Sequence, residues 1–250
     1  MKILGVIPAR FASTRFPGKP LVDIAGKTMV QRVYEQVKKS TLVTEVVVAT
    51  DDVRIMDHVE SFGGKAILTS AEHPSGTDRS FEAYQLMNEE FNYVINIQGD
   101  EPFIRPEQID LLAALLNGDT FIATLVKELK DQESLFNPNV VKAVINVKKK
   151  ALYFSRSPIP HARNTAEEAW LSQHKYFKHI GMYAYRTDVL EELTKLPISL
   201  LEKTESLEQL RWLDNGYEIL TAETKSETIG IDTPEDLQKA LTYLSENPES

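Results

Sequence analysis

Short apolar runs alternate with amphipathic stretches along most of the chain. Residues 3–7, 45–49 and 93–97 are apolar runs of the length that forms buried strands. The third run is apolar nearly throughout, which indicates burial on both faces of a parallel sheet. Between the first two, residues 28–39 place three valines on one helical face. This alternation is typical of βαβ units, so the pattern predicts an α/β fold with a mainly parallel central sheet.

The same periodicities predict the remaining elements and a change of character in the middle of the chain. Further helices are expected over 52–62, 80–87, 106–116, 188–196 and 206–215 and from Pro234, and further strands over 66–68, 140–147, 177–185 and 218–222. Ser-Pro-Ile-Pro at 157–160 and a polar stretch at 163–168 interrupt this rhythm. We therefore expect one domain over 1–250 with an inserted lobe of mixed or antiparallel strands, about 126–186, that carries a mobile loop.

Composition narrows the class of protein. The chain has 250 residues and an ordinary hydrophobic share of 42%, enough for a real core. It has no cysteine, which excludes disulfides, thiolate metal sites and a cysteine nucleophile and fits a reducing compartment. There is no apolar leader and no apolar run of the ~20 residues that a membrane helix needs. The net charge of −9 argues against nucleic acid as a partner. We expect a cytoplasmic protein with no membrane partner.

The loop after the first predicted strand, residues 7–21, is a local exception to the acidic balance, and we call it the opening loop. It reads IPARFASTRFPGKPL and gathers Arg10, Arg15 and Lys19 with the hydroxyls of Ser13 and Thr14. Three neighbouring cations repel one another unless an anion binds, and arginine can hold phosphate oxygens bidentately. The loop matches neither the GxxxxGK[ST] nor the GxGxxG phosphate-binding pattern. It is either a solvated basic turn or a phosphate site built mainly from side chains.

Two carboxylates follow other predicted strands. Asp100 lies in Gln-Gly-Asp-Glu-Pro after the third apolar run, and Asp232 lies in Asp-Thr-Pro before the last helix. Ligands of open α/β sheets bind beyond the carboxyl ends of the strands, where the opening loop also begins. Mg²⁺ typically uses one or two carboxylates together with substrate phosphates. Asp100 could instead stabilise a turn, and Asp232 could simply precede a helix cap at Thr233.

Weaker candidates each have a structural alternative. Thr77 and Arg79 lie at the start of a helix, which capping alone would explain. His179, Tyr183 and Tyr185 share one face of a strand, where aromatic residues usually pack in a core. A buried ion pair is the simplest role for Arg156, and solvent exposure is the default for Glu208 and Gln209.

Taken together, the motifs resemble those of the 3-deoxy-manno-octulosonate (KDO) cytidylyltransferases. The matching stretches, in order from residue 7 to residue 237, are IPARFASTRFPGKPLVDIAGK, VVVATDD, HPSGTDR, INIQGDEP, FNPNVVK, ALYFSRSPIP, HIGMYAYR, LEQLRWL and GIDTPEDL. The resemblance implies a Rossmann-like nucleotidyltransferase fold and the reaction of CTP with KDO to give CMP-KDO and pyrophosphate, which activates the sugar for lipopolysaccharide synthesis. It also implies a homodimer, with the inserted lobe at the interface.

The resemblance assigns roles residue by residue. Lys19, Arg10, Arg15, Asp100 and Asp232 would be catalytic, with Mg²⁺ held by Asp100 and Asp232. CTP would contact Ala9, Arg10, Ser13, Arg15, Lys19, Thr77, Arg79 and Gln98. KDO would contact Gln98, Arg156, His179, Tyr183, Glu208 and Gln209, with Arg156 pairing with its carboxylate. The alternatives are the same chemistry on an amino-KDO analogue or a sialic acid, or a nucleotide-binding regulator without activity.

Overall fold

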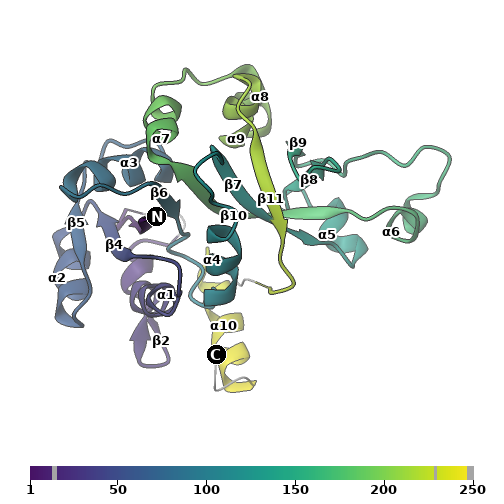
Figure 1. The fold of residues 1–250 in the computed structure, drawn as a ribbon. Helices are drawn as coiled ribbons and strands as arrows, with labels where there is room; N and C mark the ends of the chain where they lie inside the picture. Colours follow the sequence, from purple (N-terminus) through teal and green to yellow (C-terminus); the bar gives the residue numbers. More distant parts are fainter. Residues whose placement is uncertain (13–15, 228–229, 247–250) are drawn as a thin grey trace. The chain divides into compact units, whose positions relative to one another are not determined.

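The computed structural model describes residues 1–12, 16–227 and 230–246, drawn in Figure 1. The chain forms two compact units. The first unit comprises Met1–Ala114 and Glu227–Ser250, and the second comprises Leu115–Ser226. The residues of the lobe predicted at 126–186 fall within the second unit. The single domain and the bounds of that lobe stay predictions.

The first unit is built on a parallel sheet. Its strands are β1 (Ile3–Ala9), β4 (Glu45–Thr50), β5 (Ala66–Leu68) and β6 (Tyr93–Asn96), in the spatial order β6-β1-β4-β5. Every pairing among these four is parallel, as expected from the alternating pattern. All of β6 is buried, which confirms the expectation from its continuous apolar run. Their carboxyl ends therefore lie along one edge of the sheet.

Helices and a small hairpin complete the first unit. They are η1 (Lys19–Leu21), β2 (Asp23–Ile24), β3 (Lys27–Thr28), α1 (Met29–Lys38), α2 (Val53–Ser61), α3 (Gly76–Leu86), α4 (Pro106–Ala113) and α10 (Pro234–Glu246). Asp52 caps α2 through a 2.9 Å bond from the Arg54 amide, as predicted. Helix α3 begins four residues before the predicted 80–87 because Ser75 accepts bonds from the amides of Thr77 and Asp78.

The second unit has a mixed sheet. Its strands are β7 (Ile122–Glu128), β8 (Lys142–Ile145), β9 (Ala151–Ser155), β10 (Phe177–Arg186) and β11 (Ile219–Glu223). Strand β7 pairs with β10 antiparallel and with β11 parallel, and β8 pairs antiparallel with both β10 and β9. The prediction of mixed strands in this part of the chain is confirmed. A bulge in β10 between Ile180 and Tyr183 shifts its register against β7.

The helices of the second unit are short. They are α5 (Gln132–Phe136), η2 (Glu167–Ala169), α6 (Trp170–Gln173), α7 (Thr187–Thr194), α8 (Leu200–Glu205) and α9 (Gln209–Asp214). The prediction of one helix over 206–215 is wrong at its start. Ser206 ends α8 in a left-handed conformation, with φ of 52°, so α9 begins only at Gln209. The residues from Ser206 to Glu208 therefore connect α8 to α9 and belong to neither helix.

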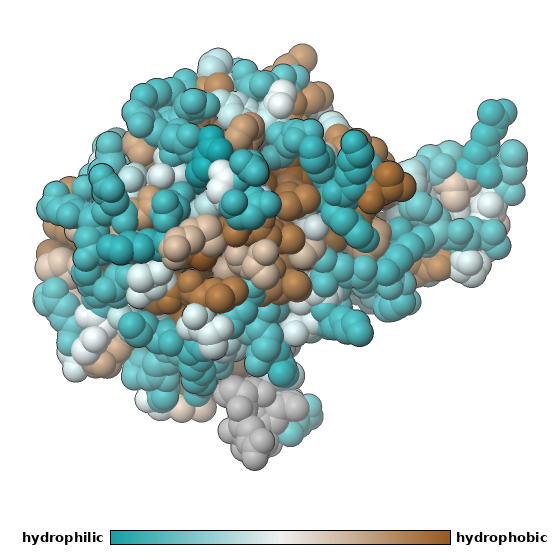
Figure 2. All heavy atoms as spheres, in the orientation of Figure 1, coloured by the Kyte–Doolittle hydropathy of each residue, from teal (hydrophilic) through white to brown (hydrophobic). Residues whose placement is uncertain are grey.

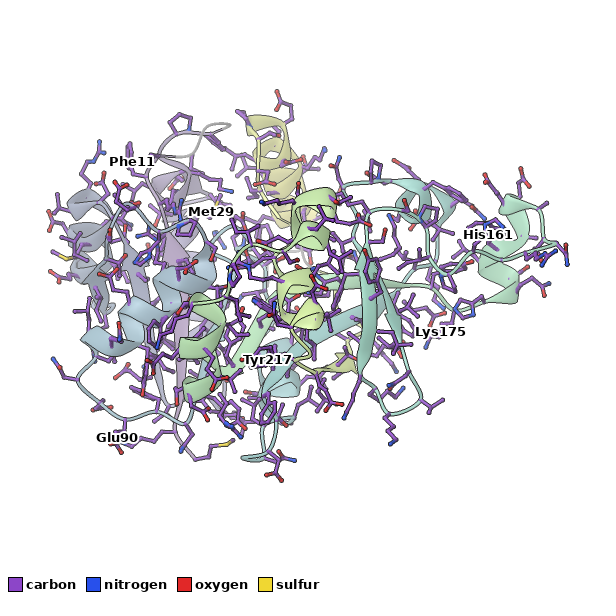
Figure 3. The ribbon with its side chains drawn as sticks, turned by 90° about the horizontal axis from the view of Figure 1, so that it is seen from above. Phe11, Met29, Glu90, His161, Lys175 and Tyr217 are labelled. Carbon is purple, nitrogen blue, oxygen red and sulfur yellow. The ribbon has the colours of Figure 1, made fainter. Side chains whose placement is uncertain are left out.

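Polar side chains cover most of the face drawn in Figure 2, and apolar side chains gather in patches between them. Several of the exposed apolar residues belong to the second unit, among them Val147, Leu152, Ile198 and Leu200. Met29, labelled in Figure 3, is by contrast fully buried in the first unit. No described helix is both long and apolar enough to cross a bilayer.

Candidate functional site

One lysine joins the two predicted carboxylates in the first unit. The Nζ atom of Lys19 lies 2.9 Å from Oδ2 of Asp100 and 3.0 Å from Oδ1 of Asp232. Burial lowers the pKa of Lys19, but the attraction of Asp100 and then Asp232 outweighs it, so its pKa is raised above the usual value. The ammonium is therefore charged at neutral pH. The residues that sequence reasoning placed at separate strand ends meet at a single point.

Close backbone packing brings Asp100 to this point. A Cβ atom on Gly99 would lie only 2.5 Å from the carbonyl oxygen of Pro8 in β1, so only glycine fits there. The Ile231 amide donates a 2.9 Å bond to the Asp100 carbonyl, which fixes the segment that carries Asp232. Ile231 itself is fully buried in a core cluster with Ile24, Met29, Phe103 and Ala240. The position of Asp100 is thus fixed by its packing against β1, and that of Asp232 by the buried Ile231 just before α10.

The start of α10 has the cap that the sequence predicts. Thr233 accepts a 3.2 Å bond from the Asp236 amide, and Asp236 in turn accepts bonds from the amides of Thr233 and Asp232. The capping duty therefore falls on Thr233 and Asp236. This leaves the carboxylate of Asp232 to Lys19.

The opening loop is folded against its own start. The Gly18 amide donates a 2.9 Å bond to the Phe11 carbonyl, and Gly18 has a left-handed φ of 72° with the Phe11 ring against its Cα. The Arg54 guanidinium lies 3.4 Å from the centroid of that ring, which is labelled in Figure 3. Arg10 donates from Nη2 to the carbonyl of His73. Ser13 and Arg15 lie outside the described residues.

Arg79 is fully buried and has two structural partners. Its Nη2 lies 2.9 Å from Oδ2 of Asp51 and its Nη1 lies 2.6 Å from Oγ1 of Thr69. Burial lowers the pKa of Arg79, and the carboxylate of Asp51 opposes that effect. The other oxygen of Asp51 accepts a 3.5 Å bond from the Phe11 amide. Arg79 thus supports the opening loop through Asp51, and its direct contact with CTP stays a prediction.

The other residues predicted on the nucleotide side also belong to the first unit. Ala9 ends β1 and is buried, Thr77 is the second residue of α3 and is buried, and Gln98 follows β6 and is partly exposed. Ala9 and Gln98 therefore lie at the carboxyl ends of β1 and β6, which lead to Arg10 and Asp100, and Thr77 lies on α3.

Of the predicted sugar-side residues, all but Gln98 belong to the second unit, and His179 and Tyr183 lie together there. The rings of His179 and Tyr183 lie 5.1 Å apart, and Tyr183 stacks on Tyr185 at 5.9 Å, so the predicted shared face is confirmed. His179 Nε2 lies 3.0 Å from Oγ1 of Thr124, and burial lowers the pKa of His179 to about 3. The ring is therefore neutral at physiological pH and can only act through hydrogen bonds and packing.

Arg156 is partly exposed and is held by backbone carbonyls. Its Nε donates 2.7 Å to the Glu205 carbonyl, its Nη1 donates 3.0 Å to that of Pro138, and its Nη2 donates 3.3 Å to that of Ser206. The buried ion pair considered from the sequence is wrong, because the guanidinium bonds carbonyls and the Glu205 carboxylate bonds the Arg156 amide at 2.9 Å.

Glu208 and Gln209 follow the break at Ser206. Gln209 is 6% exposed, so the default expectation of a solvent-facing side chain is wrong for it, while Glu208 is partly buried. The negative charge of Glu208 contributes to raising the pKa of Tyr183, after burial and Tyr185, which places the carboxyl near that ring.

Sequence reasoning missed Asp51 and Lys142. Lys142 is fully buried in the motif FNPNVVK, and its position in an apolar run was the available signal.

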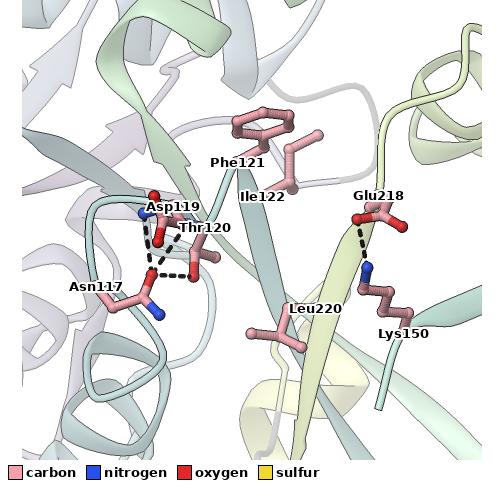
Figure 4. Close-up of a pocket in the computed structure, with 8 residues that line it drawn as sticks. All are labelled: Asn117, Asp119, Thr120, Phe121, Ile122, Lys150, Glu218 and Leu220. Carbon is pink, nitrogen blue, oxygen red and sulfur yellow. Dashed lines mark hydrogen bonds and ion pairs between the residues drawn. The ribbon is translucent and has the colours of Figure 1, made fainter. Parts of the chain in front are cut away.

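A separate pocket of about 310 Å³ opens in the second unit, at the start of β7 and β11 (Figure 4). Lys150 and Glu218 form an ion pair of 2.5 Å on its wall. Its lining residues are Asn117, Asp119, Thr120, Phe121, Ile122, Lys150, Glu218 and Leu220. None of them is a predicted site residue.

The donor chemistry of the first unit suits a hard cation. Asp100 and Asp232 each place a carboxylate oxygen next to the Lys19 ammonium. Carboxylate oxygens are the ligand type that Mg²⁺ prefers. Among the residues that the structure describes, no three histidine, aspartate or glutamate side chains are grouped as a complete metal site. A metal at this pair would need further oxygen ligands, such as substrate phosphates.

Comparisons with known proteins agree with one another. The cytidylyltransferase family model matches residues 4–224. A 3-deoxy-manno-octulosonate cytidylyltransferase of Cytophaga hutchinsonii is 59% identical over 246 residues, and the match covers 98% of each chain. One of Parabacteroides distasonis is 56% identical over 250 residues, covering 98% of this chain and 99% of the relative.

Solved structures show the same likeness. The structure of CMP:2-keto-3-deoxy-manno-octonic acid synthetase complexed with CTP has a TM-score of 0.91 and 45% identity, covering 99% of this chain and all of that one. The 4-diphosphocytidyl-2C-methyl-D-erythritol synthase of Anaerococcus prevotii, at 14% identity and a TM-score of 0.63, shares the fold alone.

Proposed function

Because this chain belongs to the cytidylyltransferase family, we propose that it transfers CMP from CTP to the anomeric hydroxyl of KDO. The products are CMP-KDO and pyrophosphate. The relatives named for this reaction match nearly the whole chain, and the similar solved structure is a complex with CTP. The α/β nucleotidyltransferase fold expected from the sequence agrees with that likeness.

The reaction is a substitution at phosphorus. The anomeric oxygen of the sugar forms a bond to the α-phosphorus of CTP, and the bond from that phosphorus to the oxygen bridging the β-phosphorus breaks. The electron pair of the broken bond leaves with pyrophosphate, and the hydroxyl proton passes to water. Negative charge therefore grows on the leaving group, and fixed positive charge placed against it lowers the barrier.

The meeting of Lys19, Asp100 and Asp232 carries the proposal. A solvated basic turn would leave its lysine in water, whereas this ammonium is mostly buried and placed by two carboxylates from distant segments. In our proposal, Lys19 and Arg10 neutralise the triphosphate, and Arg15 and Ser13 assist from the same loop.

Magnesium is a proposed cofactor. Asp100 and Asp232 would hold it, and the bound ion would acidify the attacking hydroxyl and neutralise phosphate oxygens. Asp100→Asn removes a charge with little change of shape, so we expect turnover to fall by at least about 100-fold while the protein stays folded. Pyrophosphate release at several Mg²⁺ concentrations measures this. Near-normal turnover of the folded variant would contradict the role of Asp100.

On the sugar side, Arg156 is proposed to pair with the carboxylate of KDO. His179, Tyr183, Glu208 and Gln209 are proposed to meet its hydroxyls, together with Gln98. The physical support is that neutral hydrogen-bonding groups lie together on β10, with Glu208 close enough to Tyr183 to affect its pKa, and that the Arg156 guanidinium after β9 is held in place by the carbonyl of Glu205. A homodimer is also proposed.

The proposal is tested by measuring pyrophosphate release with Mg²⁺. CTP, UTP and ATP are each supplied with KDO, with N-acetylneuraminate or with no sugar. Release with CTP and KDO only is the expected result. Release with CTP and the other acidic sugar would change the substrate and keep the chemistry. Folded protein that binds CTP but releases no pyrophosphate with either sugar would overturn the enzyme and favour a regulator.

A further inference from the structure

A second cation, Lys142, lies near Arg156. Lys142 begins β8 and is fully buried, and its Nζ donates to the carbonyl oxygens of Asn137 at 2.9 Å and of Val140 at 2.5 Å. Arg156 bonds the carbonyl of Pro138, which lies between them in sequence. The two cations therefore fasten the same four-residue turn.

The positive charge of this pair is not balanced by a direct ion pair. In the parts of the chain that the structure describes, neither the Lys142 ammonium nor the Arg156 guanidinium has a carboxylate within 4.0 Å. The nearby carboxylate, Glu205, accepts from the Ser155 hydroxyl at 2.6 Å and from the Arg156 amide at 2.9 Å, and its charge offsets only one of the two cations. Burial and then Arg156 lower the pKa of Lys142, and Glu205 opposes them. Carbonyl dipoles solvate the two cations but leave a net positive charge.

Burying an ammonium is costly, and an apolar residue of similar length would avoid that cost. An uncompensated positive charge at a partly exposed guanidinium is favourable when an anion binds there. Arginine has five N–H donors, and the three carbonyl bonds leave Arg156 with two, one on each terminal nitrogen. Two remaining donors match the two oxygens of a carboxylate.

We propose that Lys142 is a positioning residue for the carboxylate of the acidic sugar. It fastens the turn at 137–140, whose Pro138 carbonyl orients the Arg156 guanidinium, and it adds a second positive charge near that guanidinium. Lys142 does not touch the substrate. This inference rests on the proposed function, because it assumes that Arg156 receives the sugar carboxylate.

The test compares Lys142→Met with Lys148→Met, the same change at an exposed lysine in the turn after β8. Lys142→Met is expected to raise KM for KDO at least about tenfold, with KM for CTP unchanged within about twofold. The control variant is expected to keep both values. A merely structural lysine would change both KM values together or neither of them. Either of those results, in a variant whose circular dichroism is that of the wild type, overturns the proposal.

Two further arms make the outcome decisive. The carboxamide analogue of KDO is measured as a competitive inhibitor, and its affinity should change much less than the KM for KDO when Lys142 is replaced. Lys142→Gln keeps hydrogen-bond donors for the turn and loses the charge, so its KM for KDO should rise less than that of Lys142→Met. If the Met variant does not fold, the Gln variant takes its place. If neither variant folds, Lys142 is a structural residue and the proposal fails. Wild-type protein without turnover of CTP and KDO would instead overturn the proposed function.

Discussion

Lys19 has two duties that a surface lysine does not have. It forms ion pairs with both Asp100 and Asp232 in the structure, and in the proposed reaction it faces the triphosphate. Lys19→Ala should therefore lower kcat/KM for CTP by about 100- to 1,000-fold, the usual effect of losing one preorganised charge donor. Steady-state pyrophosphate release measures this. Lys27→Ala, which removes an exposed lysine from the same unit, is the control and should change little. Unchanged kinetics in the Lys19 variant would contradict a phosphate-binding role and would favour the alternative interpretation of the opening loop as a solvated basic turn.

Single residues were predictable where a local rule applied to them. Asp100 and Asp232 stood out because each follows a strand or precedes a helix in an α/β pattern, where ligand sites form. Lys142 was missed although it interrupts an apolar run, because no local pattern specifies the turn carbonyls that solvate its buried charge. Gln209 was misjudged for a related reason. Its burial follows from the left-handed Ser206, and serine gives no sequence signal for that conformation.

At the scale of elements, one carboxylate joins α4 to the loop between α1 and β4. Asp110 accepts bonds from the Ser40 hydroxyl at 2.5 Å, from the Thr41 hydroxyl at 2.8 Å and from the amides of Thr41 and Leu42. Burial raises the pKa of Asp110, but these donors outweigh it and lower the pKa below its usual value. Asp110→Asn should lower the free energy of unfolding by about 1–3 kcal/mol at pH 7.

The sign of this effect with pH follows from linkage. A carboxyl whose pKa is lower in the folded state stabilises the protein above the unfolded pKa, about 4, and loses that contribution as the pH falls through the folded value. The difference between wild type and Asp110→Asn should therefore shrink below about pH 4. Urea unfolding at several pH values measures it, with the exposed Asp57→Asn as control. A difference that is constant with pH would show that the charge of Asp110 is not involved.

A second element-scale device holds the turn that receives Arg10. Glu82 on α3 accepts from the Ser70 amide at 2.8 Å and lies 2.5 Å from Nε2 of His73, whose carbonyl accepts from Arg10. Glu82→Gln weakens both anchors, so Arg10 loses a fixed acceptor. We expect KM for CTP to rise between about threefold and tenfold, with KM for KDO unchanged. The exposed Glu60→Gln is the control. Equal rises in both KM values would indicate general loosening of the first unit.

Elements themselves were predicted best where caps and periodicity agree. The caps at Asp52 and Thr233 were read correctly, because each is a short polar side chain directly before a helical pattern. The start of α3 was missed by four residues although Ser75 is a good cap. Gly76 and Thr77 have low helix propensity, and tertiary packing of Gly76 against Pro8 and Asn96 outweighs it.

At the scale of the whole molecule, the proposed homodimer cannot be derived from composition. The structure adds a physical reason to look at β9, which among the described strands has one ladder partner, β8. Leu152 on β9 is 58% exposed, and an open strand edge with an apolar side chain favours association. Light scattering after size exclusion should give about twice the chain mass of 28.3 kDa.

Leu152→Glu places a charge on that edge, and desolvating it in an interface would cost more than the apolar contact gains. The variant should therefore elute with the mass of one chain at concentrations where the wild type is a dimer. Leu42→Glu, at a leucine of the first unit that is 44% exposed, should leave the mass unchanged. Wild-type protein with the mass of one chain would contradict the dimer. A Leu152 variant that remains dimeric would place the interface elsewhere on the second unit, because the resemblance assigns the interface to the inserted lobe and not to this residue.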